Sequence, residues 1–294
     1  MSVFPSGISA PKNAESPVFS VIMATLNPGA KLEATLHSVL EQGGSWELLI
    51  FDGGSEDGTP ELLRATAERD KRVRWWSEPD KGVWDGFNKG IDAAQGRYLY
   101  FLPAGDRIRP GVFERVAGEL PTHERGFVYG RVFLEEYGVE RDRDMTPLEL
   151  ACRNIPHQAV FYGRDIFKLF GPYNLRYPIY ADHPINIRSF ADNRVEVKYL
   201  DMVMADFEGF GLSSTKPDLN MQRDLPRIVR RYMGSRIAAR HAVYHFLWKP
   251  LLLLLRGIKR GVMKKAGIDP DRGRRSHAAR TDTPRTSPAP DAEE

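Results

Sequence analysis

Short apolar runs alternate with amphipathic stretches along the first half of the chain. The runs 20–24 and 48–51 have the length and unbroken hydrophobicity of buried strands, whereas residues 31–42 carry leucine and valine at helical spacing. Applied along the chain, these criteria predict strands over 20–24, 48–51, 73–76, 98–102 and 127–134, and helices over 31–42, 59–68 and 85–95. Strands that alternate with such helices indicate an α/β fold with a mainly parallel, Rossmann-like sheet flanked by helices.

Polar residues follow four of the predicted strands. Asn27 follows the first strand, Asp52 the second, Asp80 the third and Asp106 the fourth. Because ligands of parallel sheets bind beyond the carboxyl ends of the strands, these side chains predict a ligand site at one edge of the sheet. The alternative is that they serve turn formation only, as glycine and aspartate often do. The chain has neither a Gly-x-Gly-x-x-Gly fingerprint nor a Walker loop, which argues against dehydrogenases and P-loop enzymes.

The net charge of +3 hides an uneven distribution. Residues 1–226 contain 26 Lys and Arg against 33 Asp and Glu, whereas residues 227–275 contain 14 against 2. Basic segments of this kind bind nucleic acid, anionic lipid or nothing. Nucleic acid is not expected as a partner, because the body of the chain is acidic and carries no RNA-binding aromatic motif.

The basic segment also carries apolar residues at helical spacing. In a helix that begins at Pro250, the apolar residues share one face and the basic ones the other; the apolar ones are Leu251, Leu254, Leu255, Ile258 and Val262. With Trp248 as an interfacial anchor, this pattern predicts a helix in the plane of an anionic membrane surface, with contact through residues 244–265. The alternative is a helix packed on the main domain or on a second subunit. The longest apolar run, 250–255, is far shorter than the roughly 20 residues of a membrane span.

Changes in composition along the chain predict four parts. They are a flexible leader (1–17), an α/β domain (18–225), a basic amphipathic helical extension (226–271) and a disordered tail (272–294). The single cysteine, Cys152, cannot form an internal disulfide, which fits a reducing compartment. The leader lacks a basic start and an apolar run, so export is not expected. We therefore expect a cytoplasmic protein, peripheral on the inner face of the plasma membrane.

Four segments occur in an order and spacing that resemble the family 2 glycosyltransferases. They are FSVIMATLN (19–27), ELLIFDGGSEDGT (47–59), SEPDKGVWDGFNKG (77–90) and GRYLYFLPAGD (96–106). The resemblance extends over roughly residues 19–207. It implies a GT-A fold, a nucleotide-diphosphate sugar donor, a divalent metal (Mg²⁺ or Mn²⁺) and inversion at the anomeric carbon.

The resemblance assigns residues to the sugar-nucleotide donor. They are Thr25, Asn27, Asp52, Asp80, Asp85, Asn88 and Lys89. Asp52 would accept a hydrogen bond from the base, since a carboxylate only accepts and suits a uracil or guanine N–H. Two alternatives stay open: Asp52 caps a turn, and Asp85 is the N-cap of the helix that it begins.

Further matches concern the metal and the acceptor. Asp106 matches the last acid of the family's D-x-D element, whereas Ala104 replaces the first acid; one carboxylate can suffice when phosphate and water complete the shell of a hard cation. His157 and Gln158 would face the sugar or acceptor, although a lone histidine is often structural. Asp182 would be the base that takes the proton of the acceptor hydroxyl. Its alternative is capping of a helix that begins near Pro184.

The leading interpretation is an inverting transferase that moves a sugar to a hydroxyl of a glycan or polyprenyl-linked acceptor, in cell-surface polysaccharide or glycolipid biosynthesis. A competing one is a catalytically silent sugar-nucleotide-binding or scaffold subunit of a glycan-assembly complex, because Ala104 removes one acid of the family. Turnover distinguishes the two.

Overall fold

A computed structural model describes residues 16–135, 138–141, 143–207 and 217–248. In this part of the chain nine strands form one sheet: β1 (Phe19–Thr25), β2 (Trp46–Asp52), β3 (Val73–Ser77), β4 (Tyr98–Phe101), β5 (Arg107–Ile108), β6 (Gly126–Leu134), β7 (Val139–Arg141), β8 (Val160–Gly163) and β9 (Glu196–Phe207). The helices are α1 (Lys31–Leu40), α2 (Thr59–Arg69), α3 (Val83–Ala93), α4 (Val112–Ala117), α5 (Pro147–Cys152), α6 (Arg164–Phe170), α7 (Asp182–Ala191) and α9 (Leu219–Val243), with a 3₁₀ turn η1 (His157–Ala159) and a π-helical turn η2 (Tyr244–Trp248).

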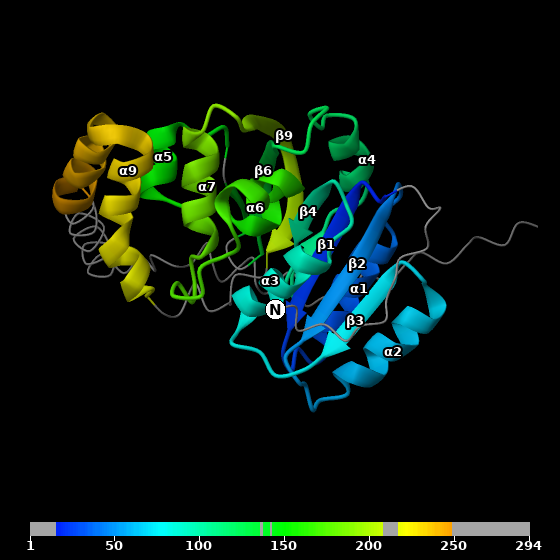
Figure 1. The fold of residues 1–294 in the computed structure, drawn as a ribbon. Helices are drawn as coiled ribbons and strands as arrows, with labels where there is room; N and C mark the ends of the chain where they lie inside the picture. The colour runs from blue at the N-terminus through cyan, green and yellow to red at the C-terminus, as the bar shows by residue number, and fades with distance from the viewer. Residues whose placement is uncertain (1–15, 136–137, 142, 208–216, 249–294) are drawn as a thin grey trace, which may run out of the picture.

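The strand order is β3-β2-β1-β4-β8-β6-β9-β5, and β7 pairs with β6 (Figure 1). The first four strands are parallel, as the sequence predicts, and they form a half-sheet with helices on both sides. β8 then pairs antiparallel with both β4 and β6, while β9 runs parallel to β6. The sheet is therefore parallel in its amino-terminal half and mixed in the other. The predicted strand over 127–134 is confirmed as β6, but β8 separates it from β4.

β1 is buried on both faces, which explains its unbroken apolar run. Val21 and Met23 pack into the core on one face of the sheet, together with residues of α1 and α4. Ile22 and Ala24 pack into the core on the other face, together with residues of α3, α5, α6 and α7. The alternation places α3 directly against β1, at the centre of the parallel half.

Two glycines let α3 lie unusually close to β1. A Cβ built on Gly86 would lie 2.7 Å from the Ala24 Cβ, and one built on Gly90 would collide with the Ile22 side chain. α3 begins at Val83, two residues before the predicted start at Asp85, and its N-cap position is Gly82. The close packing of α3 fixes the polar residues on this helix relative to the end of β1.

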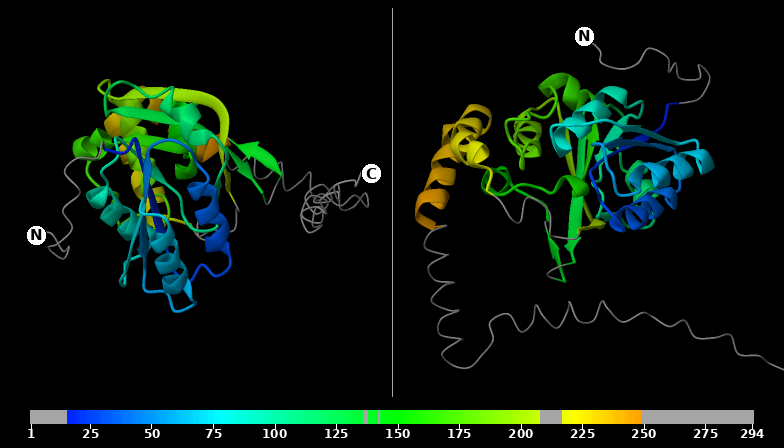
Figure 2. Two further views of the ribbon diagram at one scale, coloured as in Figure 1. Left: turned by 90° about the vertical axis from the view of Figure 1, so that its right-hand side faces the viewer. Right: turned by 90° about the horizontal axis from the view of Figure 1, so that it is seen from below.

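α9 joins the carboxyl-terminal part of the described chain to the domain. It packs against α5 and α7, at the end of the molecule opposite α2 (Figures 1 and 2). Met221 and Val229 of α9 are buried in the main core. The predicted domain boundary at residue 225 therefore falls inside a helix whose buried residues belong to the core of the α/β domain. The helix is interrupted at Gly234, where φ is 82°.

The predicted membrane helix from Pro250 onward lies outside the described residues. The same holds for residues 1–15 of the predicted leader and for the whole predicted tail. Within the part of the chain that the structure describes, no helix is long and apolar enough to cross a membrane.

The contact between α3 and β1 predicts that Gly90→Ala destabilises the protein. The added methyl group must displace Ile22 or shift α3, and such overpacking costs about 1–3 kcal/mol. Denaturant unfolding of the variant and the wild type measures this cost.

Gly118→Ala is the matched control. Gly118 has φ −69°, and its added Cβ would lie 3.7 Å from the nearest atom, the Arg115 carbonyl oxygen. This variant should be neutral or stabilised by up to about 1 kcal/mol. Equal stability of the two variants would contradict the proposed close packing.

Candidate functional site

The carboxyl ends of β1, β2 and β3 form the first half of the site. The strand register places Thr25 opposite Asp52, and Asp52 opposite Ser77. Thr25 is 7% exposed, and its Oγ1 has no hydrogen-bond partner within the described residues. A buried hydroxyl without a partner costs free energy, so Thr25 is available to a ligand at this edge.

The Asp52 carboxylate is buried and held by two serines. The Ser77 hydroxyl donates to Oδ2 at 2.6 Å, the Ser55 backbone N–H donates to Oδ2 at 3.0 Å, and the Ser55 hydroxyl donates to Oδ1. The bond to the Ser55 backbone is the turn-capping contact that the sequence left open. A carboxylate has about four acceptor positions, so Asp52 can cap this turn and still accept one ligand N–H.

Asn27 connects the loop after β1 to the loop after β2. Its backbone N–H donates to the Ser55 hydroxyl at 2.7 Å, and its Oδ1 accepts from the Glu56 backbone N–H at 2.9 Å. Its φ of 46° lies in the left-handed region, which asparagine tolerates better than most residues. The two loops thus form one unit, so a ligand that contacts either is positioned by both.

Asp80 and Asp85 lie on the segment that leads from β3 into α3. A Cβ built on Gly53 would lie 3.1 Å from Asp80 Oδ2, so Asp80 lies beside the end of β2. Asp85 is in the first turn of α3, where its Oδ2 accepts from the Lys81 backbone N–H at 3.1 Å. Asp85 is therefore not the N-cap of α3, because the helix begins at Val83, earlier than predicted.

Asn88 and Lys89 are already engaged by protein groups. Asn88 Nδ2 donates to the Tyr173 carbonyl at 2.9 Å, and the Tyr173 N–H donates to Asn88 Oδ1 at 2.8 Å. Lys89 Nζ pairs with Glu78 Oε1 at 2.7 Å. In this structure Asn88 fastens the loop before α7 to α3. Donor contacts of both residues stay predictions.

The second half of the site comes from β4 and the entry to β8. Because β8 is antiparallel to β4, with Tyr100 opposite Phe161, the amino end of β8 lies at the carboxyl end of β4. The turn η1 therefore places Gln158 against Asp106, and Gln158 Nε2 donates to Asp106 Oδ2. Both side chains are buried, at 2% and 4% exposure. Asp106, the predicted metal ligand, and Gln158, a predicted sugar contact, are thus in direct contact.

Asp182 is buried at the start of α7, at 2% exposure. Asn154 Nδ2 donates to its Oδ2 at 2.8 Å, and His157 Nδ1 lies 3.8 Å from the same oxygen. Its Oδ1 is buried and has no hydrogen-bond partner within the described residues. The helix begins at Asp182 and not near Pro184, and among the described residues no backbone N–H donates to the Asp182 carboxylate. One carboxylate oxygen is thus held by Asn154, and the other has no hydrogen-bond partner among the described residues.

A chain of hydrogen bonds supports Asp182 from the core. Tyr162 OH donates to Asn186 Oδ1 at 2.8 Å, and Asn186 Nδ2 donates to Asn154 Oδ1 at 2.8 Å. Burial, together with the charge of Asp182, raises the pKa of Tyr162 well above its usual value, so this hydroxyl stays protonated. Sequence reasoning missed Asn154 and Asn186, because nothing in their spacing shows that α7 and the loop after α5 adjoin.

Aromatic rings join the two halves. The His157 ring packs edge to face against Trp84 and Phe87 of α3, with centroids 5.6 Å apart in both pairs. Trp84 Nε1 donates to the Pro178 carbonyl at 3.1 Å, in the loop before α7. His157 Nε2 is buried and has no hydrogen-bond partner within the described residues. α3 thereby fixes both the donor end and the Asp182 end of the site.

The metal prediction depends on one carboxylate. Within the described residues, no group of three or more His, Cys, Asp or Glu could hold a metal ion. Asp106 alone, oriented by Gln158, fits a Mg²⁺ or Mn²⁺ ion whose other ligands are diphosphate and water oxygens. The ion would neutralise charge on the leaving diphosphate.

Solved structures with the same architecture are known. The Staphylococcus aureus protein TarS (residues 1–349, in complex with UDP-GlcNAc) superposes with a TM-score of 0.64 at 16% identity, over 78% of this chain and 72% of that one. The mannosyltransferase PcManGT from Pyrobaculum calidifontis, in complex with GDP-Man and Mn²⁺, gives 0.61 at 16% identity, over 92% and 82%. The chain has the GT-A fold that the sequence predicts.

Sequence relationships give the family. Residues 20–176 match the family described as Glycosyl transferase family 2. A PGL/p-HBAD biosynthesis glycosyltransferase of Mycobacterium tuberculosis (strain ATCC 25177 / H37Ra) is 38% identical over 231 residues, which cover 76% of this chain and 88% of that relative. The chain belongs to glycosyltransferase family 2. It is an enzyme that transfers a sugar from a nucleotide sugar.

His183, next to Asp182, gives a prediction about pH. Its Nε2 contacts the Leu150 carbonyl at 2.7 Å, and burial lowers its pKa. The unfolded chain therefore binds a proton below about pH 6.5, whereas the folded protein binds it only at lower pH. Stability should fall as the pH drops through this range.

We expect His183→Gln, which can still donate to Leu150, to weaken this pH dependence, because the variant lacks the group whose pKa burial lowers. Urea unfolding at several pH values measures it. His37→Gln is the control, because the His37 side chain is 70% exposed, and its slope should match the wild type. An unchanged slope in His183→Gln would show that another group causes the effect.

Proposed function

We propose that the protein is an inverting glycosyltransferase that moves a sugar from a UDP- or GDP-sugar to a hydroxyl of a glycan or lipid-linked acceptor. The observation that carries this proposal is the pair of buried carboxylates, Asp106 and Asp182, which contact adjacent residues of one turn. Asp106 lies at the end of β4, where the diphosphate is expected, and Asp182 keeps one oxygen without a partner. The two thus have different tasks in one site.

In the proposed reaction the acceptor hydroxyl gives its proton to Asp182 Oδ1. The acceptor oxygen then forms a bond to the anomeric carbon, on the face opposite the leaving group, while the bond from that carbon to the diphosphate oxygen breaks. Asn154 holds the other oxygen of Asp182, so the carboxylate does not rotate away. Thr25, Asn27, Asp52 and Asp80 would bind the nucleotide part of the donor at the ends of β1 to β3.

The acceptor class is supported by the relatives. The name of the mycobacterial relative places that protein in PGL/p-HBAD biosynthesis, which favours a glycolipid acceptor here. A polyprenyl-linked or polysaccharide acceptor uses the same chemistry. Contact with the inner face of the plasma membrane through residues 244–265 would bring such an acceptor to the site. In the described part of this segment, Phe246 and Leu247 are 70% and 65% exposed.

Release of nucleoside diphosphate tests the reaction. The wild type is incubated with UDP-, GDP- and dTDP-sugars and lipid extract, with Mn²⁺, Mg²⁺ or chelator. One donor should turn over, and Asp182→Asn should lower the rate by at least about 100-fold, because general base catalysis contributes roughly 10²–10⁴. Asp165→Asn removes a carboxylate paired with Lys168 on α6 and should leave the rate unchanged.

Donor binding without release by the wild type would support the silent-subunit interpretation. Release that is equally fast in Asp182→Asn would overturn the role of Asp182 and leave the family assignment intact. Chelator-resistant release would overturn the metal proposal for Asp106. The anomeric configuration of the product tests inversion separately.

Asn154→Ala tests whether Asn154 positions Asp182. Loss of one hydrogen bond to a charged group should lower kcat about tenfold. KM for the donor should stay the same, because Asn154 lies at the acceptor end of the site. A change in KM with kcat unchanged would contradict a positioning role.

A further inference from the structure

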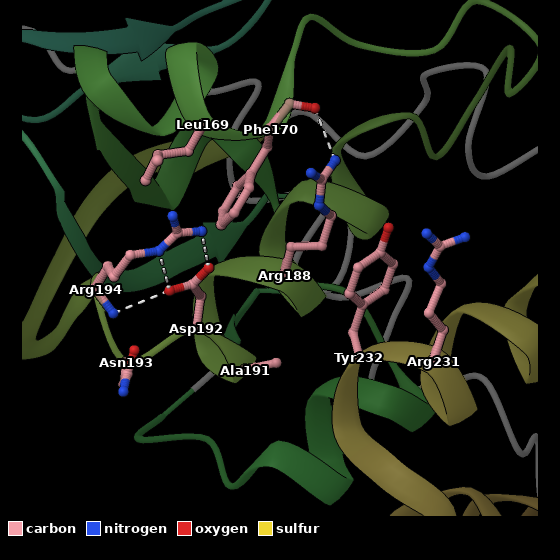
Figure 3. Close-up of a pocket in the computed structure, with 9 residues that line it drawn as sticks. All are labelled: Leu169, Phe170, Arg188, Ala191, Asp192, Asn193, Arg194, Arg231 and Tyr232. Carbon is pink, nitrogen blue, oxygen red and sulfur yellow. Dashed lines mark hydrogen bonds and ion pairs between the residues drawn. The ribbon is translucent and has the colours of Figure 1, made fainter.

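Two adjoining hollows lie beside α9, away from the candidate active site. The first, of about 600 Å³, lies between the ends of α6 and α7 and the middle of α9, and its lining includes Phe170, Arg188, Arg231 and Tyr232 (Figure 3). The second, of about 490 Å³, shares Arg231 and Tyr232 with the first. Three arginines line the first hollow and four line the second. Arg188 is near the end of α7 opposite Asp182, so this site does not serve the candidate base directly.

Arg188 has an unusual environment for a cation. Its Nη1 donates to the Phe170 carbonyl at 2.7 Å, and its guanidinium lies 4.3 Å from the Phe170 ring centroid and 5.3 Å from that of Tyr232. Its Nε is buried and has no hydrogen-bond partner within the described residues. Burial lowers the pKa of Arg188, and nearby Arg231 adds to this effect. The guanidinium is thus held in place by Phe170. Asp192 acts on it only through a longer-range charge interaction, and Arg188 forms no ion pair within the described residues.

The neighbouring arginines differ in whether they are paired. Arg194 forms a two-point ion pair with Asp192, and Arg176 and Arg223 share Asp224. Arg227 and Arg231 form no ion pair or hydrogen bond with any residue in the described ranges, and both are exposed. Arg188, Arg227 and Arg231 therefore leave an excess of positive charge in the hollows. We call these three residues the arginine face.

Unpaired guanidinium groups attract phosphate. A guanidinium presents planar, forked N–H groups that match phosphate oxygens, and its weak hydration makes the exchange of water for phosphate favourable. An anion between Arg188 and Arg231 would also relieve the repulsion between these two cations. The ligand chemistry of the arginine face is therefore a phosphate monoester or diester.

We propose that the arginine face binds the headgroup phosphates of an anionic membrane. Arg227 and Arg231 lie on the part of α9 before the kink at Gly234. The part after the kink, together with η2, carries the exposed apolar residues Val243, Phe246 and Leu247. Tyr232 lies between the cations and is 36% exposed, and tyrosine is enriched at the level of lipid headgroups. Arginine and exposed tyrosine before the kink, followed by exposed apolar residues after it, are a combination that a lipid surface stabilises.

α7 carries both Asp182, at its start, and Arg188, near its end. α7 connects Arg188 to Asp182, and six residues of helix span about 9 Å. A bilayer bound at the carboxyl-terminal end of α7 would lie close to the acceptor end of the site. A lipid-linked acceptor could then reach Asp182 without leaving the membrane.

Vesicle co-sedimentation of the full chain tests this proposal. The vesicles contain either equimolar phosphatidylglycerol and phosphatidylcholine or phosphatidylcholine alone, and no sugar nucleotide is present. We expect Arg227→Gln/Arg231→Gln to bind the anionic vesicles roughly 30-fold more weakly than the wild type, since each charge near an anionic surface is worth about fivefold. Neither residue has a described ion pair or hydrogen bond, so the variant should fold. Arg188→Gln is a second variant, with unfolding measured alongside.

The matched control is Arg64→Gln/Arg69→Gln on α2, at the opposite end of the molecule (Figure 1). It removes the same charge from exposed positions and should change binding less than about twofold. Every variant keeps residues 244–265, so any contribution of this segment to vesicle binding is the same in all the proteins compared. Equal binding by the two double variants would overturn the proposal. Equal binding of the wild type to both kinds of vesicle would do the same.

Pyrophosphate in solution distinguishes a free anion from a membrane. If the arginine variants lose affinity for pyrophosphate but not for vesicles, the hollows bind a free phosphate and the membrane proposal is wrong. Because the assay contains no donor, a failure here leaves the proposed transfer reaction untouched.

Discussion

The antiparallel pairing of β8 with β4 is the constraint on which the candidate site depends. Parallel strands present their carboxyl ends at one edge of the sheet, and an antiparallel strand presents its amino end at the same edge. His157 and Gln158 precede β8, so this pairing brings them to Asp106, which follows β4. The connection through His157 to Asp182 then joins the start of α7 to the sheet. Two carboxylates distant in sequence thus share one buried environment.

The second constraint is the close approach of α3 to β1. It is possible because Gly86 and Gly90 have no side chains. α3 then fastens the loop before α7 through Asn88 and Trp84. The carboxyl ends of β1 to β3 and the surroundings of Asp182 are therefore coupled through one helix, which keeps their separation fixed. A site that transfers a group between two bound molecules needs such a fixed separation.

The acidic residues of the candidate site and the basic residues of the arginine face lie in different parts of the molecule. The body of the chain is acidic, yet three acids of the site, Asp52, Asp106 and Asp182, are buried and accept hydrogen bonds from neutral donors. These donors are Ser77, Gln158 and Asn154. The excess of arginine gathers on α9, at the far end of α7. Asp182 and Arg188 lie toward opposite ends of α7, so the buried acids of the site and the arginine face are separated along one helix.

The sequence by itself determined the parallel half of the fold and the polar residues that lie at its carboxyl edge. Unbroken apolar runs specify strands buried on both faces, and residues at or shortly after the end of such a strand lie at its carboxyl edge, as Asp52 does at the end of β2 and Asp106 does after β4. It also determined the family, through motifs within short stretches of chain. Only the tertiary structure decided the position of β8, the support of Asp182 by Asn154 and Asn186, the engagement of Asn88, and the packing of α9 across residue 225. These features depend on contacts between distant segments, and local spacing carries no information about which distant segments meet.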